Sequence, residues 1–511
     1  MAASENAALP GGKVGGVGDV VRDLPRALAR EGWRSKVLTP EYGLFAGLPG
    51  ARKTGQLDVA FGGRQLAVDV ISIADESDDI EHIVFAHPQF APQGPKIYCD
   101  DGHARPFASD AGKFALFAAA TAAYVRNLAE PPDVVHLHDW HAALYCLLRQ
   151  FDPTAEALQA IPTVYTIHNL ALQGIRPLQD DPSSLAAWFP QLAVDADAVV
   201  DPRYGDCINP MATAVRLADA LNTVSPTYAS EILRPNDPER GFRGGEGLEA
   251  DLAAADANGR LFGILNGCEY PRLDRRRPGW RRLLDTIGGD LYEWIVNHKG
   301  PREIHEDSIE HLRALPKRRP RNLLTSIGRL TEQKAQLLLQ RNSEGATAIE
   351  KILGSHARDT VVMILGSGDP SYEREIAEIA THHKNLLFIC GYSEQLSDLL
   401  YRTGDLFLMP SSFEPCGISQ MLAMRAAQPC VVHAVGGLRD TVQHDVNGFV
   451  FDGNSPLEQA ENFIDTVSHA IAIKNVDQDL WLKIRGAARN ARYRWTDSAR
   501  QYVDKLYFRK P

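Results

Sequence analysis

The sequence contains no uninterrupted apolar run near the roughly 20 residues that a membrane-spanning helix needs, so an integral membrane protein is not expected. Its N-terminus lacks the charged-then-apolar pattern of a secretory signal. The seven cysteines are odd in number and scattered, without the paired spacing of a metal site. Unpaired thiols are typical of a reducing compartment, and we predict a cytoplasmic protein.

An excess of positive charge is also absent, because 54 Lys and Arg residues stand against 65 Asp and Glu residues, for a net charge of −11. A negative chain has no general attraction to polyanions, so neither nucleic acid nor an anionic membrane is expected as a partner. With 44% hydrophobic and 23% charged residues over 511 positions, the composition is that of a globular protein with two domains.

Short apolar runs recur along the chain, and each ends in a polar or glycine-rich stretch before a helical pattern. The runs cover residues 133–137, 163–168, 220–224, 261–265, 322–327, 361–365, 386–390, 406–409 and 430–434. Repeated strand-then-helix units predict an α/β protein with doubly wound parallel sheets and polar residues at the carboxyl ends of the strands. The glycine-rich stretch 241–259 is interpreted as a linker, so the run at 261–265 is expected to open the second domain.

A glycine-rich loop at residues 11–19 leads into a helical pattern that runs to Arg30. Glycines let backbone N–H groups approach a ligand closely, and Lys13 adds a positive charge beside them. A strand normally precedes such a loop, but residues 1–10 are only weakly strand-like. Either the start lies further upstream or the first sheet lacks its central strand, and a flexible N-terminal tail is a further alternative.

Three histidines within six residues, His136, His138 and His141, raise the alternative of a metal site. On a strand the first two share a face, whereas His141 falls on the next turn. A shared metal ion is therefore not favoured.

Charged side chains follow two strands of the second half. Glu414 stands alone between the strand at 406–409 and a helical pattern, and Arg329 and Lys334 follow the strand at 322–327. A turn and a helix start can bring both cations to one diphosphate, where they would stabilise the charge of a leaving group. Taken singly, each is more simply a surface residue. Without an evident acidic metal cluster, these cations and neutral backbone donors would replace Mg²⁺.

In this order, the motifs resemble those of the bacterial glycogen synthase and plant starch synthase family. The resemblance runs over nearly the whole chain and rests on residues 13–19, 138–141, 166–171, 222–228, 263–267, 329–334 and 413–417. It implies the GT-B fold, in which two Rossmann-like domains face each other across a deep cleft. The acceptor-side domain is expected at 1–250, the nucleotide-sugar domain at 251–489, and a helix crossing back to the first domain at 490–511.

The resemblance also implies the reaction. Glucose would pass from ADP-glucose to the non-reducing 4-hydroxyl of an α-1,4-glucan, glycogen or a maltooligosaccharide, with retention of anomeric configuration. No cofactor and no metal are expected. Because no covalent nucleophile is obvious, we favour a same-face mechanism in which the leaving phosphate helps deprotonate the acceptor. A double displacement through Glu414 or Asp139 is the alternative.

Residue roles follow from the same resemblance. The expected catalytic residues are Glu414, His168, Arg329, Lys334 and Asp139. Glu414 and His168 would hold the glucose, and the two cations would stabilise the leaving diphosphate. The expected substrate-binding residues are Lys13, Gly15, Gly16, Asp19, Asn266, Gly366, Gly368, Tyr392, Cys416, Gly417, Ile418, Gly436 and Gly437.

Some positions depart from the family's pattern. Val14 and Val435 stand where threonine is usual, and the arginine-rich residues 271–320 follow no family pattern. The lost hydroxyls leave UDP-glucose as an alternative donor. A small-acceptor enzyme such as a maltose-1-phosphate synthase is a second alternative, although those relatives usually carry a glutamate where Leu422 stands. A non-catalytic glucan-binding paralogue is a third alternative, and the synthase is favoured over it because burying unused charges is costly.

Overall fold

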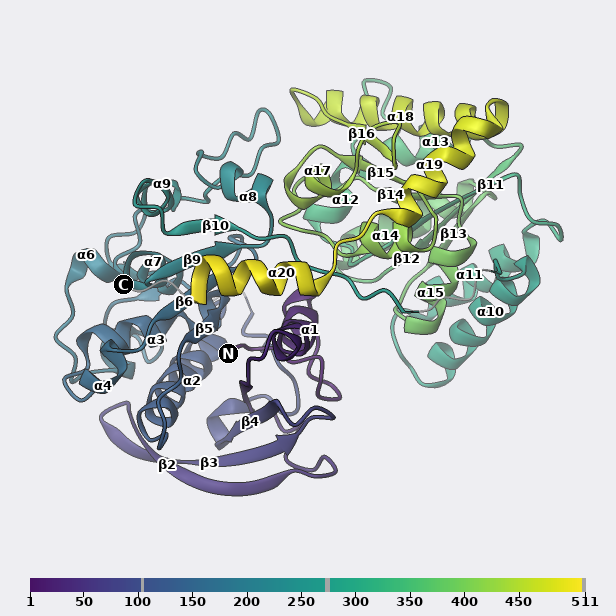
Figure 1. Cartoon of the computed structure of the whole chain (residues 1–511). Helices are drawn as coiled ribbons and strands as arrows, with labels where there is room; N and C mark the ends of the chain where they lie inside the picture. Colours follow the sequence, from purple (N-terminus) through teal and green to yellow (C-terminus); the bar gives the residue numbers. More distant parts are fainter. Residues whose placement is uncertain (103–104, 272–275, 508–511) are drawn as a thin grey trace. The chain divides into compact units, whose positions relative to one another are not determined.

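The computed structural model describes residues 1–102, 105–271 and 276–507 (Figure 1). Its contacts divide the chain into two compact units. The first comprises Met1–Asn236, Gly244–Gly267 and the chain from Arg494 onward, and the second comprises Asp237–Arg243 and Cys268–Tyr493. The chain thus passes between the units after residues 236, 243, 267 and 493, whereas the sequence placed the domain boundaries near 250 and 490. Among the described helices, none is both long and apolar enough to cross a membrane.

The first unit is built on one sheet in two halves, with strand orders β2-β3-β4-β1 and β5-β6-β9-β10. The strands are β1 (Ser35–Pro40), β2 (Arg52–Phe61), β3 (Arg64–Ala74), β4 (Ile80–Ala86), β5 (Val135–His138), β6 (Thr163–Ile167), β9 (Ala220–Thr223) and β10 (Leu261–Gly263). A separate pair is formed by β7 (Arg176–Pro177) and β8 (Cys207–Ile208).

Ala2 joins the two halves of this sheet by parallel bridges to Leu38 of β1 and Leu137 of β5. The N–H of Ala2 donates to the carbonyl of His136 at 2.8 Å, and the N–H of Ala3 donates to the carbonyl of Leu38 at 3.1 Å. The expectation that the first sheet might lack its central strand is therefore wrong: residues 1–3 pair on both sides and fill that position.

Helices cover this sheet. They are α1 (Gly16–Arg30), α2 (Ala108–Arg126), α3 (Asp139–Phe151), α4 (Glu156–Gln159), α5 (Leu185–Trp188), α6 (Ala196–Val199), α7 (Pro210–Leu217), α8 (Pro226–Glu231), α9 (Glu249–Ala257) and α20 (Trp495–Tyr502), with the 3-10 helix η1 (Pro88–Phe90) and the π-helix η2 (Val503–Tyr507). In Figure 1, α20 in yellow lies beside α1 in purple. Their shared core contains Val20, Leu24, Trp495 and Tyr502. The tail was expected to run to residue 511, and residues 508–511 lie outside the described part.

Two assignments around residue 250 are wrong. The stretch interpreted as a linker contains α9, and the strand expected to open the second domain is β10, which pairs in parallel with β9 of the first sheet. The strand itself was predicted correctly, because β10 (Leu261–Gly263) lies within the expected run 261–265. Which sheet the strand joins depends on its partner, and a local apolar pattern does not specify that partner.

The second unit contains a parallel sheet of order β13-β12-β11-β14-β15-β16. Its strands are β11 (Asn322–Ile327), β12 (Thr360–Leu365), β13 (Leu386–Ile389), β14 (Leu406–Met409), β15 (Cys430–His433) and β16 (Phe449–Phe451). Its helices are α10 (Trp280–Val296), α11 (Arg302–Ala314), α12 (Glu332–Leu339), α13 (Ala348–Ser355), α14 (Pro370–His382), α15 (Glu394–Thr403), α16 (Ser419–Arg425), α17 (Gly436–Thr441), α18 (Pro456–Val476) and α19 (Gln478–Asn490).

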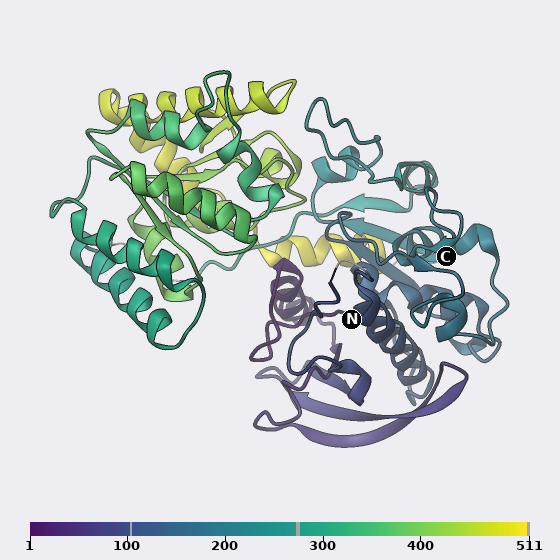
Figure 2. The same ribbon diagram turned by 180° about the vertical axis from the view of Figure 1, so that it is seen from behind.

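Both faces of this sheet are buried. On β12, Val362 and Ile364 face a core shared with α13 and α18, whereas Val361 and Met363 face a core shared with α10 and α15. Figure 2 shows α18 and the α10–α11 pair on different sides of the sheet. The arginine-rich region of the sequence thus forms a covering helical pair, with residues 272–275 outside the described part. The second unit is the doubly wound Rossmann-like domain that the sequence predicted.

Candidate functional site

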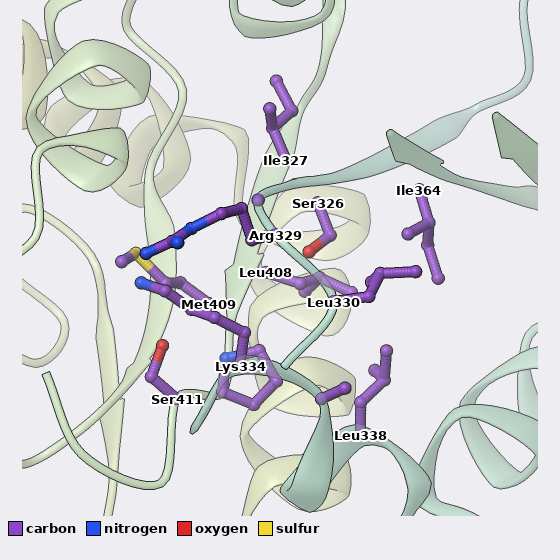
Figure 3. A pocket seen from close by; sticks show the side chains of 13 residues that line it. Ser326, Ile327, Arg329, Leu330, Lys334, Leu338, Ile364, Leu408, Met409 and Ser411 are labelled. Carbon is purple, nitrogen blue, oxygen red and sulfur yellow. The ribbon is translucent and has the colours of Figure 1, made fainter. Parts of the chain in front are cut away.

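In the second unit, charged side chains gather where β11 and β14 end. The two strands are hydrogen-bonded neighbours, so the residues that follow them meet at one edge of the sheet. A pocket at this edge is lined by Arg329 and Lys334 from the β11 side and by Met409 and Ser411 from the β14 side (Figure 3). Figure 3 shows the nitrogen-bearing ends of Arg329 and Lys334 on the same side of the pocket.

Glu414 is buried at this edge, with 7% of its surface exposed. Lys334 Nζ donates to Glu414 Oε2, and Ser411 Oγ donates to the same oxygen at 3.0 Å. No described residue forms a hydrogen bond or ion pair with the guanidinium of Arg329, which is exposed. One cation thus neutralises the buried carboxylate, and the second faces solvent and is available to an anion.

Glycines let the neighbouring loops approach the Glu414 turn. A Cβ on Gly436 would lie 2.0 Å from the carbonyl oxygen of Glu414, and one on Gly437 would lie 2.2 Å from that of Cys416. The Gly437 N–H donates to the Glu414 carbonyl at 3.1 Å. Side chains larger than hydrogen would push this turn away, so the two glycines hold Glu414 in place.

Gly366 and Gly368 serve the Arg329 loop in the same way. A Cβ on Gly366 would lie 2.0 Å from the carbonyl oxygen of Gly328, and one on Gly368 would lie 2.3 Å from that of Leu330. Their N–H groups donate to Ile389 at 3.1 Å and to the Glu373 carboxylate at 2.7 Å. These N–H groups, expected as phosphate donors, thus have partners within the protein.

The remaining expected residues of this unit surround the same edge. Tyr392 follows β13 and is 64% exposed. Cys416 is buried, Gly417 has a φ of +75°, and Ile418 precedes the first residue of α16. The left-handed φ of Gly417 turns the chain from the Glu414 turn into this helix.

In the first unit, Asp139 and His168 lie at the ends of β5 and β6. Asp139 has a φ of +54°, and its carboxylate accepts the backbone N–H of His168 at 2.7 Å. His138 Nδ1 and His168 Nε2 are 3.0 Å apart. Burial raises the pKa of Asp139 to about 7 and lowers that of His168 to about 3, so the imidazole is neutral.

The three neighbouring histidines have separate partners. His136 contacts Thr166 Oγ1 at 2.7 Å and Tyr507 OH at 2.8 Å, whereas the His141 ring packs on Phe114 and Trp140. His136 is therefore bonded to the chain's last described residue. Sequence reasoning missed Tyr507, because nothing local links positions so distant in the chain.

The glycine-rich loop is ordered by a carboxylate that sequence reasoning also missed. Buried Glu5 accepts the N–H groups of Val14 at 2.8 Å and Gly15 at 2.6 Å. Lys13 and Asp19 form an ion pair at 2.7 Å across the start of α1. The alternative of a flexible tail is therefore wrong. An acid shortly before a glycine loop was the only available signal, and it is a weak one.

Two expected binding residues of this unit remain. Gly16 is exposed at the first turn of α1. Asn266 is 5% exposed, and its Oδ1 has no hydrogen-bond partner among the described residues. A buried amide oxygen without a partner is costly, which makes Asn266 a candidate for binding a ligand.

Asp139 should make the stability of the protein depend on pH. Its carboxyl has a folded pKa of about 7 against an ordinary value of 3.8, so across this range the folded protein holds a proton that the unfolded chain releases. Stability should therefore fall as pH rises from about 4 to 7. In Asp139→Asn this contribution should be lost. Thermal unfolding of both proteins at several pH values would check this, and parallel Tm curves would contradict it.

Comparisons with known proteins agree across the chain. Residues 1–254 match the family profile "Starch synthase catalytic domain", and residues 307–478 match "Glycosyl transferases group 1". A glycogen synthase of Anaeromyxobacter dehalogenans is 34% identical over 86% of this chain and 84% of its own length. One of Gloeobacter violaceus is 31% identical over 99% and 97%.

Solved structures give the same picture. The catalytic domain of Starch Synthase IV from Arabidopsis thaliana, bound to ADP and acarbose, aligns with a TM-score of 0.75 at 25% identity over 99% of this chain and 97% of that one. A sucrose-phosphate synthase from Thermosynechococcus elongatus aligns with a TM-score of 0.55 at 16% identity over 98% and 96%, a likeness of fold alone.

Proposed function

The chain belongs to the glycogen synthase and starch synthase family of glycosyltransferases, and we propose that it transfers glucose from ADP-glucose to the non-reducing 4-hydroxyl of an α-1,4-glucan with retention of configuration. The proposal rests on one observation: Arg329, Lys334 and Glu414 lie together at the carboxyl edge of the sheet of the second unit. It combines a free cation, a paired cation and a buried carboxylate, which are the groups that a sugar diphosphate needs.

The donor binds at this edge with its diphosphate against Arg329 and Lys334. As the bond from the sugar to the phosphate breaks, the diphosphate gains negative charge, and fixed cations stabilise that charge most in the transition state. Glu414, held by Lys334 and Ser411, accepts hydrogen bonds from glucose hydroxyls. The exposed ring of Tyr392 offers a stacking surface for the base, and the ADP bound to the Arabidopsis relative supports adenine there.

The acceptor side is provided by the first unit. His168, neutral because of its burial, hydrogen-bonds the glucose, and Asp139 fixes the backbone at His168. Lys13, Gly16, Asp19 and Asn266 contact the diphosphate or the glucan. Because the carboxylates of Asp139 and Glu414 both have hydrogen-bond partners within the protein, a same-face transfer in which the leaving phosphate takes the acceptor proton is favoured over a double displacement through either of them. Charge neutralisation by side chains makes a metal or other cofactor unnecessary.

The test is an assay with glycogen and either ADP-glucose or UDP-glucose, following nucleoside diphosphate release and glucose incorporation together. We expect incorporation mainly from ADP-glucose, in linkages that an α-1,4-specific glucosidase removes. Preference for UDP-glucose would overturn the assignment of ADP-glucose as the donor. Transfer to glucose 1-phosphate instead of glycogen would overturn the assignment of the glucan as the acceptor. A folded protein that binds glycogen but releases no nucleoside diphosphate from either donor would overturn the proposal that the chain is an enzyme.

A further inference from the structure

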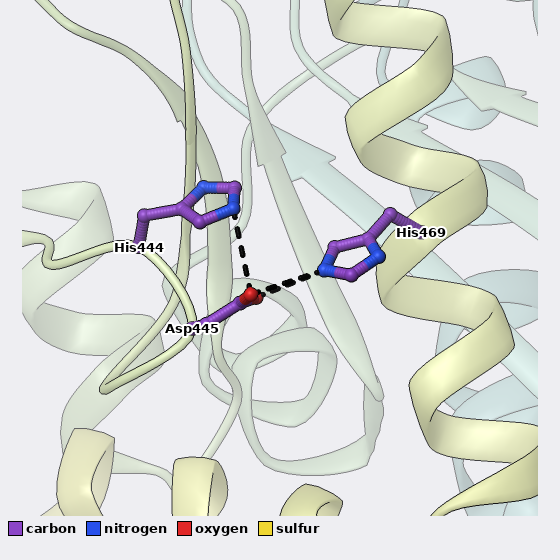
Figure 4. Close-up of side chains that lie close together, drawn as sticks. All are labelled: His444, Asp445 and His469. Atoms are coloured by element: carbon purple, nitrogen blue, oxygen red, sulfur yellow. Dashed lines mark hydrogen bonds and ion pairs between the residues drawn. The ribbon is translucent and has the colours of Figure 1, made fainter.

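Three potential metal ligands converge on the surface of the second unit, away from the residues discussed above. His444 and Asp445 lie on the turn between α17 and β16, and His469 lies on α18 (Figure 4). Their ligand atoms all lie within 4.8 Å of one another. Among the described residues, this is the group in which three His, Cys, Asp or Glu side chains lie close enough together to share one metal ion.

The geometry of the three groups is close to that of a tetrahedral metal ion. Asp445 Oδ2 lies 3.2 Å from His469 Nε2 and 3.6 Å from His444 Nε2. Two ligand atoms each about 2.1 Å from a tetrahedral Zn²⁺ lie about 3.4 Å apart, between these two distances. The His444 and His469 rings are parallel, with an interplanar angle of 1° and centroids 5.9 Å apart, so both present Nε2 to the same carboxylate (Figure 4).

The side chains are held by the protein before any ion binds. His444 Nδ1 lies 3.0 Å from the carbonyl oxygen of Val450, and donation to this oxygen leaves Nε2 as the metal-binding nitrogen. The N–H of Val450 is 3.1 Å from the same nitrogen, so the ring is fixed in either tautomer. Asp445 has a φ of +57°, and the Asn447 side chain accepts the Gln443 N–H at 2.7 Å across the turn. A metal ion would select the first tautomer.

We propose that His444, Asp445 and His469 bind one divalent transition-metal ion, Zn²⁺ in particular, as a structural clip between the β16 turn and α18. Two imidazoles and one carboxylate suit Zn²⁺ or its neighbours rather than Mg²⁺ or Ca²⁺, which prefer oxygen ligands. Three protein ligands leave a fourth position for water, in keeping with side chains that are 41–48% exposed.

The clip does not take part in glucose transfer. The turn precedes β16, which runs parallel to β15, so the cluster lies at the amino end of these strands, whereas Glu414 and Gly436 lie at the carboxyl end. Metal binding should therefore raise stability through mass action and leave the transfer rate unchanged. Metal binding at His444, Asp445 and His469 is therefore independent of the proposed glucosyltransferase function.

The test is titration of the full-length, metal-free protein with Co²⁺, read by its visible absorption, and with Zn²⁺, read by calorimetry. We expect one ion per chain with a Kd below about 100 μM and a Tm higher by at least about 2 °C with Zn²⁺. His469→Ala should weaken binding at least tenfold and abolish the Tm shift. His382→Ala, which removes an exposed histidine from α14, is the matched control and should change neither.

The ordinary alternative is that His469 and Asp445 form only a surface hydrogen bond. In that case the titration with Co²⁺ would show no saturable site. Alternatively, the His469→Ala variant would bind Co²⁺ with the same stoichiometry and affinity as the parent protein, through thiols or other histidines. Either result would overturn the proposal. A metal that binds at His469 but inhibits transfer would overturn the structural role.

Discussion

Lys334→Met is expected to lower kcat for glucose transfer by about 10³-fold, equivalent to about 4 kcal/mol of transition-state stabilisation. The substitution keeps the length of the side chain and removes its charge. It leaves Glu414 buried without its cation and reduces the positive charge of the pocket that Lys334 shares with Arg329. The assay is ADP release with glycogen at saturating ADP-glucose.

Lys351→Met is the matched control, because Lys351 also pairs with a glutamate, Glu344, on the surface near α13. An exposed pair contributes little, so this variant should retain the parent rate. Circular dichroism would verify that both variants fold. If Lys334→Met kept a kcat within threefold of the parent while remaining folded, neither the leaving-group role of Lys334 nor the donor position argued for the second unit would stand.

Trp495→Ala is expected to lower the free energy of unfolding of the first unit by about 3–5 kcal/mol. Trp495 is 1% exposed and belongs to a core with Val20, Val164 and Ala499. A Cβ on Gly267 would lie 2.6 Å from Trp495 Cγ, so the chain packs directly against this side chain, and removing the indole leaves a cavity.

Differential scanning calorimetry is the suitable measurement, because two units need not unfold in one step. The transition of the first unit should shift down, and that of the second unit should stay. Tyr204→Ala is the control: Tyr204 belongs to the same unit but is 53% exposed, so its loss should cost less than about 0.5 kcal/mol. Equal shifts for the two variants would contradict the role of the last helix in this core.

The sequence predicted what local patterns encode. Apolar runs bounded by polar residues located β11 through β15, and the family resemblance assigned the cations after β11 and the acid after β14 to one site. Lys334 and Glu414 are 80 residues apart in the sequence, yet their side chains meet. They do so because β11 and β14 are neighbouring parallel strands, so the residues that follow the two strands lie at the same edge of the sheet.

Local patterns could not supply partners. β10 looked like any first strand, and only its pairing with β9 assigns it to the first unit. Glu5 beneath the glycine loop, and Tyr507 against His136, are contacts between segments whose proximity depends on the finished fold. The steric role of Gly436 and Gly437 was hidden for the same reason, since the obstacle is the carbonyl oxygen of another loop.

The core of the first unit includes residues 495–507, which are translated after the whole second unit, and this order affects how the protein folds during translation. Chain elongation lets segments fold in the order in which they emerge, usually N-terminal domain first. Here residues 268–493 are continuous within the second unit, whereas the first unit waits for Trp495 and Tyr502. The unit that is translated first is therefore completed last, and until residues 495–502 have emerged its α1 surface is open to chaperones and to aggregation.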